Sequence, residues 1–178
     1  INMLFVGDFY QHTYDTSRDG NANKNLFDNF PNYEARFINR GFLSDKTSLV
    51  KSWRCSSSVC HFITENLGIE IYSNQKTEMS SEASDIIFLS EQAQINSILA
   101  NPNIVKLHFR NSSKYGSSHR NWGDTKGEDH YQDVCVMLNK ATAEKYAAGK
   151  LCKLAPSTRN KLYVAITRAH GKVYLINE

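Results

Sequence analysis

Polar side chains that could bind an anion stand at several points of the chain, each beside a predicted element boundary. Arg168 belongs to a run with helical spacing, because Leu162, Ala165, Ile166 and Ala169 occupy positions i, i+3, i+4 and i+7. At about 100° per residue, Arg168 lies roughly 110° from the centre of that apolar stripe. We therefore expect its guanidinium to be free to contact a ligand outside the core.

Arg54 stands at a second position where an anion could bind, just before a predicted helix. Ser56 to Ser58 offer N-caps for that helix, and Gly68 offers a stop. Helix N-termini favour anions because the free N–H groups and the positive end of the helix dipole lie there. We expect a phosphate to be held beside Arg54. The alternative is an arginine that only faces solvent.

Two further polar segments stand beside predicted strands. Asp8 and Gln11 follow the strand-like run Met3–Val6, so they would lie at the carboxyl end of a strand, where open α/β sheets bind ligands. The glycine-containing loop Trp122–Glu128 precedes the strand-like run Val134–Leu138. The alternatives are a common glycine-aspartate turn in the first segment and a charged surface turn in the second.

The elements that must position these residues alternate between strands and helices. Strand-like apolar runs occupy five places: Met3–Val6, Asp85–Leu89, Ile104–Phe109, Val134–Leu138 and Val173–Ile176. Helical patterns cover 56–67, 90–100, 142–148 and 160–169. This alternation predicts an α/β fold with a parallel sheet. The polar segments 15–25 and 111–124 predict irregular loops, and a domain boundary is expected near 28–32.

The composition excludes several classes of protein. With 178 residues, 40% hydrophobic and 22% charged, the chain fits one soluble globular domain, and no apolar run nears the ~20 residues that span a bilayer. No basic secretory leader precedes the first strand-like run, so we expect a cytoplasmic protein whose chain begins inside a longer one. The net charge of +3 permits nucleic-acid binding without demonstrating it.

Cysteine and histidine give no metal-binding pattern. The cysteines form no C-x-x-C pair, so reduced thiols are expected at Cys55, Cys60, Cys135 and Cys152. Three histidines are far apart in the sequence and equally weak as a metal set: His108, His119 and His130. We predict no structural metal.

Taken together, the candidate segments resemble motifs III, IV, V and VI of UvrD/Rep-like superfamily 1 DNA helicases, in family order. G-D-F-Y-Q resembles motif III (G-D-x-x-Q), and Y-V-A-I-T-R-A resembles motif VI. W-R-C-S departs from the usual N-Y-R-S of motif IV. T-K-G-E resembles motif V, although the usual apolar residue after the glycine is missing. The resemblance covers nearly the whole chain, but the stretch between Arg54 and Trp122 is too short for the large inserted subdomain of UvrD-type enzymes.

This resemblance implies a fold and a domain division. The fold would be a RecA-like parallel sheet flanked by helices, of the P-loop NTPase type and corresponding to the second motor domain. Residues 1–30 would be the end of the first RecA-like domain with motif III, and residues 31–178 would be the C-terminal RecA-like helicase domain with motifs IV, V and VI.

The resemblance also assigns roles to individual residues. The side chains expected to act on the γ-phosphate of ATP are Gln11, Arg54 and Arg168. Gly127 and Glu128 would complete the nucleotide site, with Glu128 reaching the sugar. The residues expected to contact single-stranded DNA are Tyr14, Trp122, Thr125 and Lys126.

The chain contains no G-x-x-x-x-G-K-[ST] phosphate loop and no Walker B carboxylates. ATP and Mg²⁺ would therefore be bound mainly by an N-terminal RecA-like domain of the same protein, and this part alone is not expected to hydrolyse ATP. We expect the C-terminal motor domain of an ATP-dependent superfamily 1 DNA helicase. The alternatives are a catalytically inactive, helicase-derived module that binds nucleic acid or docks to a protein, and an RNA-directed helicase.

Overall fold

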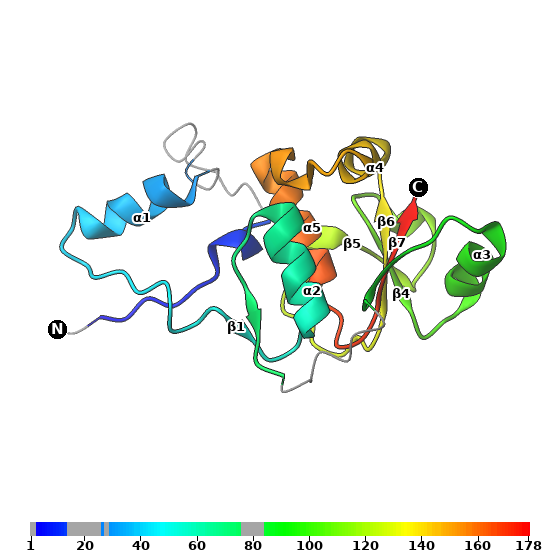
Figure 1. The fold of residues 1–178 in the computed structure, drawn as a ribbon, viewed down its shortest axis with the longest axis horizontal. Helices are drawn as coiled ribbons and strands as arrows, with labels where there is room; N and C mark the ends of the chain where they lie inside the picture. The colour runs from blue at the N-terminus through cyan, green and yellow to red at the C-terminus, as the bar shows by residue number, and fades with distance from the viewer. Residues whose placement is uncertain (1–2, 14–25, 27–28, 76–83) are drawn as a thin grey trace.

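The computed structural model describes residues 3–13, 26, 29–75 and 84–178, which form an α/β fold around a five-stranded sheet (Figure 1). All neighbouring strands are parallel. In sheet order the strands are β3 (Ile86–Phe88), β7 (Val173–Asn177), β6 (Val134–Leu138), β4 (Val105–His108) and β5 (His119–Asn121). Helices cover the sheet, as in Rossmann-like and RecA-like arrangements, so the predicted fold class is confirmed.

Helices lie on both faces of this sheet. Helices α2 (Ser57–Phe62) and α5 (Pro156–Ile166) contribute to the larger core, which lies against Val134, Val136 and Leu138 of β6. Helix α3 (Gln92–Ala100) packs on the other face, against a smaller core that contains Cys135 and Met137. β6 is buried at every position because it lies at the sheet centre between two layers of helix, which explains its continuous apolar sequence.

Local sequence signals set the ends of these helices. The Ser56 hydroxyl accepts the N–H of Val59 at 3.4 Å and caps α2. The helix continues as the π-helical turn η2 (Ile63–Leu67) and stops at Gly68, whose φ of 63° is left-handed, as the sequence predicts. Helix α3 has Glu91 at its N-cap position, where the sequence predicts Ser90. Asn139 caps α4 (Lys140–Ala147), accepting the N–H of Thr142 at 3.0 Å.

Shorter elements complete the described chain. Helix α1 (Phe30–Ile38) lies outside the sheet layers, and a two-stranded parallel pair joins β1 (Lys51–Ser52) to β2 (Tyr72–Ser73) (Figure 1). The 3₁₀ turns are η1 (Phe9–Gln11), η3 (Ser112–Lys114), η4 (Trp122–Thr125) and η5 (Leu151–Lys153).

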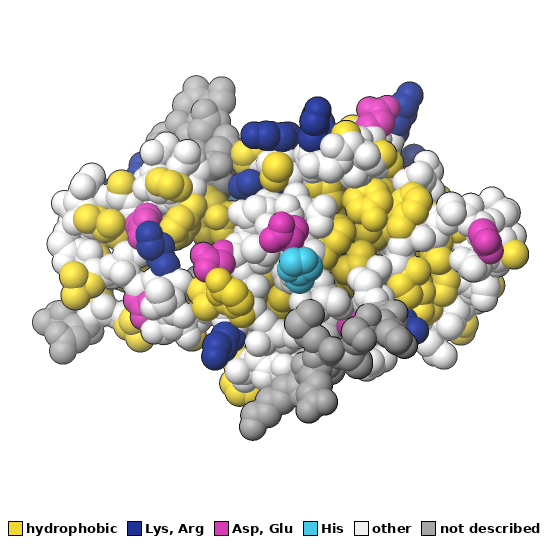
Figure 2. All heavy atoms as spheres, in the orientation of Figure 1, with side chains coloured by type: hydrophobic (Ala, Val, Ile, Leu, Met, Phe, Trp, Pro, Cys, Tyr) yellow, Lys and Arg dark blue, Asp and Glu magenta, His cyan; other side chains and the backbone are white. Residues whose placement is uncertain are grey.

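The first predicted strand is wrong. Met3–Val6 forms no strand, and Leu4 is 87% exposed. A buried parallel strand needs hydrogen-bonding neighbours, and no described strand pairs with this segment. Its apolar side chains contact α1 and the turn after it instead, since the ring of Phe5 lies 6.0 Å from that of Phe37 and 5.4 Å from that of Phe42. Figure 2 shows hydrophobic side chains gathered over this N-terminal part of the molecule.

Two other predictions need correction. The segment 111–124 was expected to be irregular, but it contains the edge strand β5, together with η3 and the start of η4. The helix predicted over 160–169 begins earlier, at Pro156, which suits a first helical turn, and ends at Ile166. It is also less amphipathic than predicted, because every residue from Leu162 to Ile166 is buried. The predicted loop 15–25 lies outside the described residues.

No helix in the described part of the chain is both long enough and apolar enough to cross a lipid bilayer.

Gly171, in the turn before β7, packs tightly against the turn that precedes β6, and a substitution there tests how close this contact is. A Cβ there would lie 2.5 Å from Asp133 Oδ1 and 3.1 Å from the carbonyl oxygen of Gln132. Asp133 cannot move freely, because it also accepts the N–H of Lys172 at 2.8 Å. We expect Gly171→Ala to lower the free energy of unfolding by about 1–3 kcal/mol in urea denaturation. Gly7→Ala, where nothing lies within 4 Å of the added carbon, is the matched control and should change it little.

Candidate functional site

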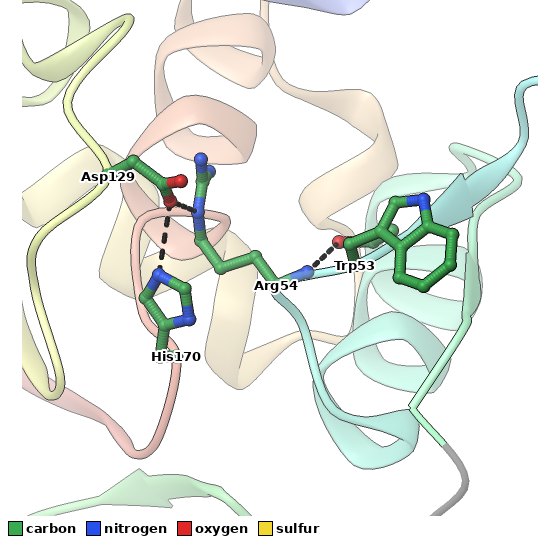
Figure 3. A pocket seen from close by; sticks show the side chains of 5 residues that line it. Trp53, Arg54, Asp129 and His170 are labelled. Atoms are coloured by element: carbon green, nitrogen blue, oxygen red, sulfur yellow. Dashed lines mark hydrogen bonds and ion pairs between the residues drawn. The ribbon is translucent and has the colours of Figure 1, made fainter.

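A pocket of about 210 Å³ brings together segments that are far apart in the sequence (Figure 3). Its lining consists of Ser52, Trp53, Arg54, Asp129 and His170. Asp129 precedes β6, His170 precedes β7, and Arg54 precedes α2. The pocket therefore lies at the amino ends of two central strands, not at the carboxyl edge where open α/β sheets commonly bind ligands.

The turn before α2 fixes the backbone of Arg54. Ser52 Oγ accepts the N–H of Cys55 at 3.0 Å and that of Arg54 at 3.3 Å. Gln75 Nε2 donates to the carbonyl oxygen of Arg54 at 2.6 Å. Because these bonds hold the main chain, the guanidinium is directed across the pocket toward the loops that precede β6 and β7.

The guanidinium of Arg54 joins three of the predicted motif segments. Its Nη1 donates to the carbonyl oxygen of Thr167, in motif VI, at 2.8 Å, and its Nε donates to Asp129, just after motif V. Asp129 also accepts a hydrogen bond from His170 Nε2 at 3.1 Å. The side chain of Arg54 keeps 22% of its surface exposed, so it is the accessible cation of the pocket.

Asp129 is held as a charged group. The hydrogen bond from Arg54 is the main reason why the pKa of Asp129 lies below its ordinary value, and His170 adds to the effect. The side chain is nevertheless 62% exposed. Exposed ion pairs of this kind contribute little because water screens them, so the carboxylate can be displaced by a stronger anion.

Arg168 is buried, which corrects the expectation that it faces away from the core. Only 2% of the residue is exposed. Its guanidinium donates at 3.1–3.4 Å to the carbonyl oxygens of Val164, Thr125 and Glu128 and to the hydroxyl of Thr167. The helix ends at Ile166, two residues before the arginine, so the side chain of Arg168 does not follow the helical angle that the spacing predicts. Arg168 instead ties the end of α5 to the motif V loop.

Two positive charges act on each other at this site. Desolvation is the largest cause that lowers the pKa of Arg168, and the charge of Arg54 is the next. Within the described residues, the hydrogen bonds shown for Arg168 end on neutral oxygens only. The negative charge of Asp129 thus compensates part of the positive charge of the two guanidiniums. Its side chain is exposed to solvent. Such an arrangement attracts a second anion.

In the motif V loop, the side chain of Lys126 faces solvent and the hydroxyl of Thr125 is buried. Lys126 is exposed, and Gly127 has a φ of 88° that favours glycine. The carboxylate of Glu128 accepts a hydrogen bond from the hydroxyl of Tyr131. Desolvation, with this bond and the charge of Glu128, raises the pKa of Tyr131 to about 12. This bond holds Glu128 through its Oε2 atom against Tyr131.

Two of the residues predicted to contact DNA have buried side chains. Trp122 is completely buried, and its Nε1 donates to the carbonyl oxygen of Leu107 at 2.9 Å, so its ring cannot stack on a base. Thr125 is also completely buried, and its hydroxyl donates to the carbonyl oxygen of Trp122 at 3.0 Å. Both side chains turn inward because η4 follows β5 directly and packs against α5.

Motif III packs on α5 and does not line the pocket. Asp8 Oδ2 accepts hydrogen bonds from Tyr163 at 2.9 Å and from Gln11 Nε2 at 3.1 Å. Asn160 Nδ2 donates to the carbonyl oxygen of His12 at 3.2 Å. Gln11 therefore lies near motif VI, but not beside Arg54. Since Met3–Val6 is not a strand, the expected place at a strand end is wrong. Tyr14 lies outside the described residues.

Sequence reasoning missed four of the five residues that line the pocket, namely Ser52, Trp53, Asp129 and His170. Trp53 is 82% exposed, and its ring points away from the guanidinium of Arg54 (Figure 3). Its place between Ser52 and Arg54, off any apolar period, is a signal that could have been used. Asp129 and His170 carry no such signal, because only the parallel pairing of β6 with β7 brings their loops together.

No group of three or more His, Cys, Asp or Glu side chains is arranged to hold a metal ion in the ranges that the structure describes. Comparison with models of known protein families and with curated protein sequences finds no match for this chain.

Replacing Arg168 tests its bracing role. We expect Arg168→Ala to lower the free energy of unfolding by about 2–4 kcal/mol, since three carbonyl oxygens lose a charged donor. Amide hydrogen exchange in 125–129 should accelerate more than in β6. Lys153→Ala, at an exposed position, is the control. A loss below about 0.5 kcal/mol, within the range of ordinary surface substitutions, would contradict the role.

Proposed function

We propose that the chain is the C-terminal RecA-like motor domain of an ATP-dependent superfamily 1 DNA helicase. One observation carries the proposal: Arg54 of the motif IV segment lines a pocket with Asp129 beside motif V, and it bonds both to Asp129 and to the buried Thr167 of motif VI. Segments that resemble successive motifs of this family thus meet around a positively charged group. The parallel α/β sheet is the fold expected for such a domain.

In this proposal Arg54 is the residue that contacts the transferring phosphate. A phosphate oxygen would take the place of the Asp129 carboxylate, and the bond to Thr167 would keep the guanidinium directed toward it. Arginines that stabilise the charge developing in phosphoryl transfer contribute ~10³–10⁵ in rate. The exposed ring of Trp53, on the other side of the Arg54 backbone, offers a stacking surface for a base.

Arg168 has a different role from the one expected. Because it is buried and bonded to the carbonyl oxygens of Thr125 and Glu128, it would position the motif V loop and add positive potential behind Arg54. A direct phosphate contact would require the loop to move. Gln11 would act at the same boundary, since motif III packs on α5 through Asp8 and Tyr163.

An N-terminal RecA-like domain of the same protein would supply the phosphate loop and the Mg²⁺ site. ATP would then lie between the two domains, and closure around it would be released on hydrolysis. Single-stranded DNA would pass across both domains. Lys126 is an exposed cation that suits a backbone phosphate, and Tyr14 remains a predicted stacking residue at roughly 1–3 kcal/mol per base.

A second candidate function has a specific observation in its favour. Arg54 is already bonded to Asp129, and Arg168 is buried, as expected for a helicase-derived module that binds nucleic acid or a protein without turning over ATP. An RNA-directed helicase is the third possibility, because neither arginine distinguishes DNA from RNA.

The proposal is tested in the longer protein that would contain both domains. We expect Arg54→Ala to lower DNA-stimulated ATP turnover by about 10³-fold or more, since it removes charge stabilisation in the transition state. Arg110→Ala, which removes an exposed arginine outside the pocket, should leave turnover unchanged. Turnover within about threefold of wild type in Arg54→Ala would refute the role of Arg54. A wild-type protein without any ATP turnover would favour the inactive module.

Competition between labelled single-stranded DNA and RNA of equal length tests the nucleic-acid preference. We expect DNA to compete better for the longer protein and Lys126→Ala to weaken both about equally, because a phosphate contact carries no sequence or sugar information. Preference for RNA would replace the DNA assignment.

A further inference from the structure

Two histidines on neighbouring strands, His108 on β4 and His119 on β5, lie in direct contact with each other. His108, on β4, is 2% exposed, and His119 lies on the edge strand β5. His108 Nε2 is 2.8 Å from His119 Nδ1, and His108 Nδ1 is 3.1 Å from Glu178 Oε1. Glu178, His108 and His119 therefore form a chain of one carboxylate and two imidazoles.

The number of protons in this chain is limited by geometry. A carboxylate only accepts hydrogen bonds, so His108 Nδ1 carries a proton toward Glu178. Only one proton fits between two ring nitrogens 2.8 Å apart, whichever ring it belongs to. If both facing nitrogens were protonated, two N–H groups would point at each other and the rings would have to separate.

The surroundings oppose an additional positive charge. Lys106, two residues before His108 on β4, is 1% exposed, and its ammonium donates to the carbonyl oxygen of Asn101. Desolvation is the largest cause that lowers the pKa of His119, followed by the charges of His108 and Lys106. On β6 the thiol of Cys135 lies near Lys106, and burial raises its pKa to about 12, so it is neutral at ordinary pH.

The ring of Tyr115 covers the pair from the segment between β4 and β5. Its ring stacks on that of His108 with centroids 4.3 Å apart and planes 8° from parallel. Its hydroxyl donates to Glu178 Oε1 at 3.3 Å. Tyr115 thus depends on the position of His108, and the loop that carries it depends on the same contact.

The contact fastens an edge of the sheet. In the described sheet β5 pairs only with β4, over three residues. The N–H of Ser112 donates to Asn121 Oδ1 at 2.9 Å, which ties the preceding loop to the end of β5. β5 then leads directly into η4 and the motif V loop. So short a pairing has few hydrogen bonds of its own, which makes the side-chain contact between His108 and His119 important for its position.

We propose that the His108–His119 pair is an acid-sensitive switch. Protonation of both imidazoles puts a proton on each of the two facing nitrogens, which breaks the contact between the rings and releases β5 and the segment 112–121 from β4, while the central strands stay folded. The proposal holds whether or not the chain binds ATP.

The lowered pKa of His119 determines how the stability of the contact changes with pH. Above the ordinary histidine pKa of about 6.5, the contact is intact and contributes its full stability. As the pH falls below that value, the open state binds more protons than the closed one, so the contact weakens until the lowered pKa of His119 is passed. Acid therefore opens the edge, and neutral pH closes it.

Hydrogen exchange on this chain, corrected for the intrinsic pH dependence of exchange, tests the switch. Between about pH 7.5 and about pH 5, amide protection in 112–121 should fall about tenfold, while protection in β6 changes less than twofold. His119→Asn places an amide nitrogen near the Nδ1 position, where it donates to His108 without titrating. This variant should keep the protection and lose its pH dependence. His61→Asn, at an exposed position on α2, should behave as wild type.

Two results would overturn the proposal: constant protection of 112–121 in the wild-type chain across this range, or an equal fall in His119→Asn. If His119→Asn folds poorly, imidazole ¹⁵N shifts in the wild-type chain give the same decision. They should show one proton on the facing nitrogens at the higher pH and two at the lower. A single proton at both values rules out the switch.

Discussion

The buried guanidinium of Arg168 is the interaction on which the site depends. A charge removed from water must be compensated by hydrogen bonds, and Arg168 finds its acceptors at the end of α5 and in the motif V loop. These bonds fix the position of Thr167, whose carbonyl oxygen accepts a hydrogen bond from Nη1 of Arg54. The position of the accessible arginine is therefore set by the inaccessible one, and the two cannot be considered separately.

The opposing charge of Asp129 gives the pocket a defined resting state. Two guanidiniums close together repel each other, and one carboxylate shared by Arg54 and His170 reduces that repulsion. Because Asp129 is exposed, this compensation costs little to remove. The positive charge of the two guanidiniums is thus partly compensated, and the pocket is not blocked.

The sequence predicted features that depend on a single strand or helix, and it did not predict contacts between elements that are far apart in the chain. The apolar run Val134–Leu138 and the Ser56 cap with the Gly68 stop were predicted correctly, because they depend on local periodicity and backbone conformation. The outward direction of Arg168 was predicted wrongly, since one angle assumed a helix that continued past Ile166. Trp122 was assigned to DNA because nothing in its neighbours reveals that β5 turns it inward. The meeting of Asp129 with His170 follows only from the parallel pairing of β6 with β7.

The unequal covering of the two sheet faces has a consequence for how the molecule comes apart. Helix α3 has no fully buried residue, and the core beneath it is the smaller of the two. Helices α2 and α5, by contrast, contribute many side chains to the larger core. Detachment of α3 therefore loses little apolar contact, so a protease can cut the connections beside it while the larger core stays folded.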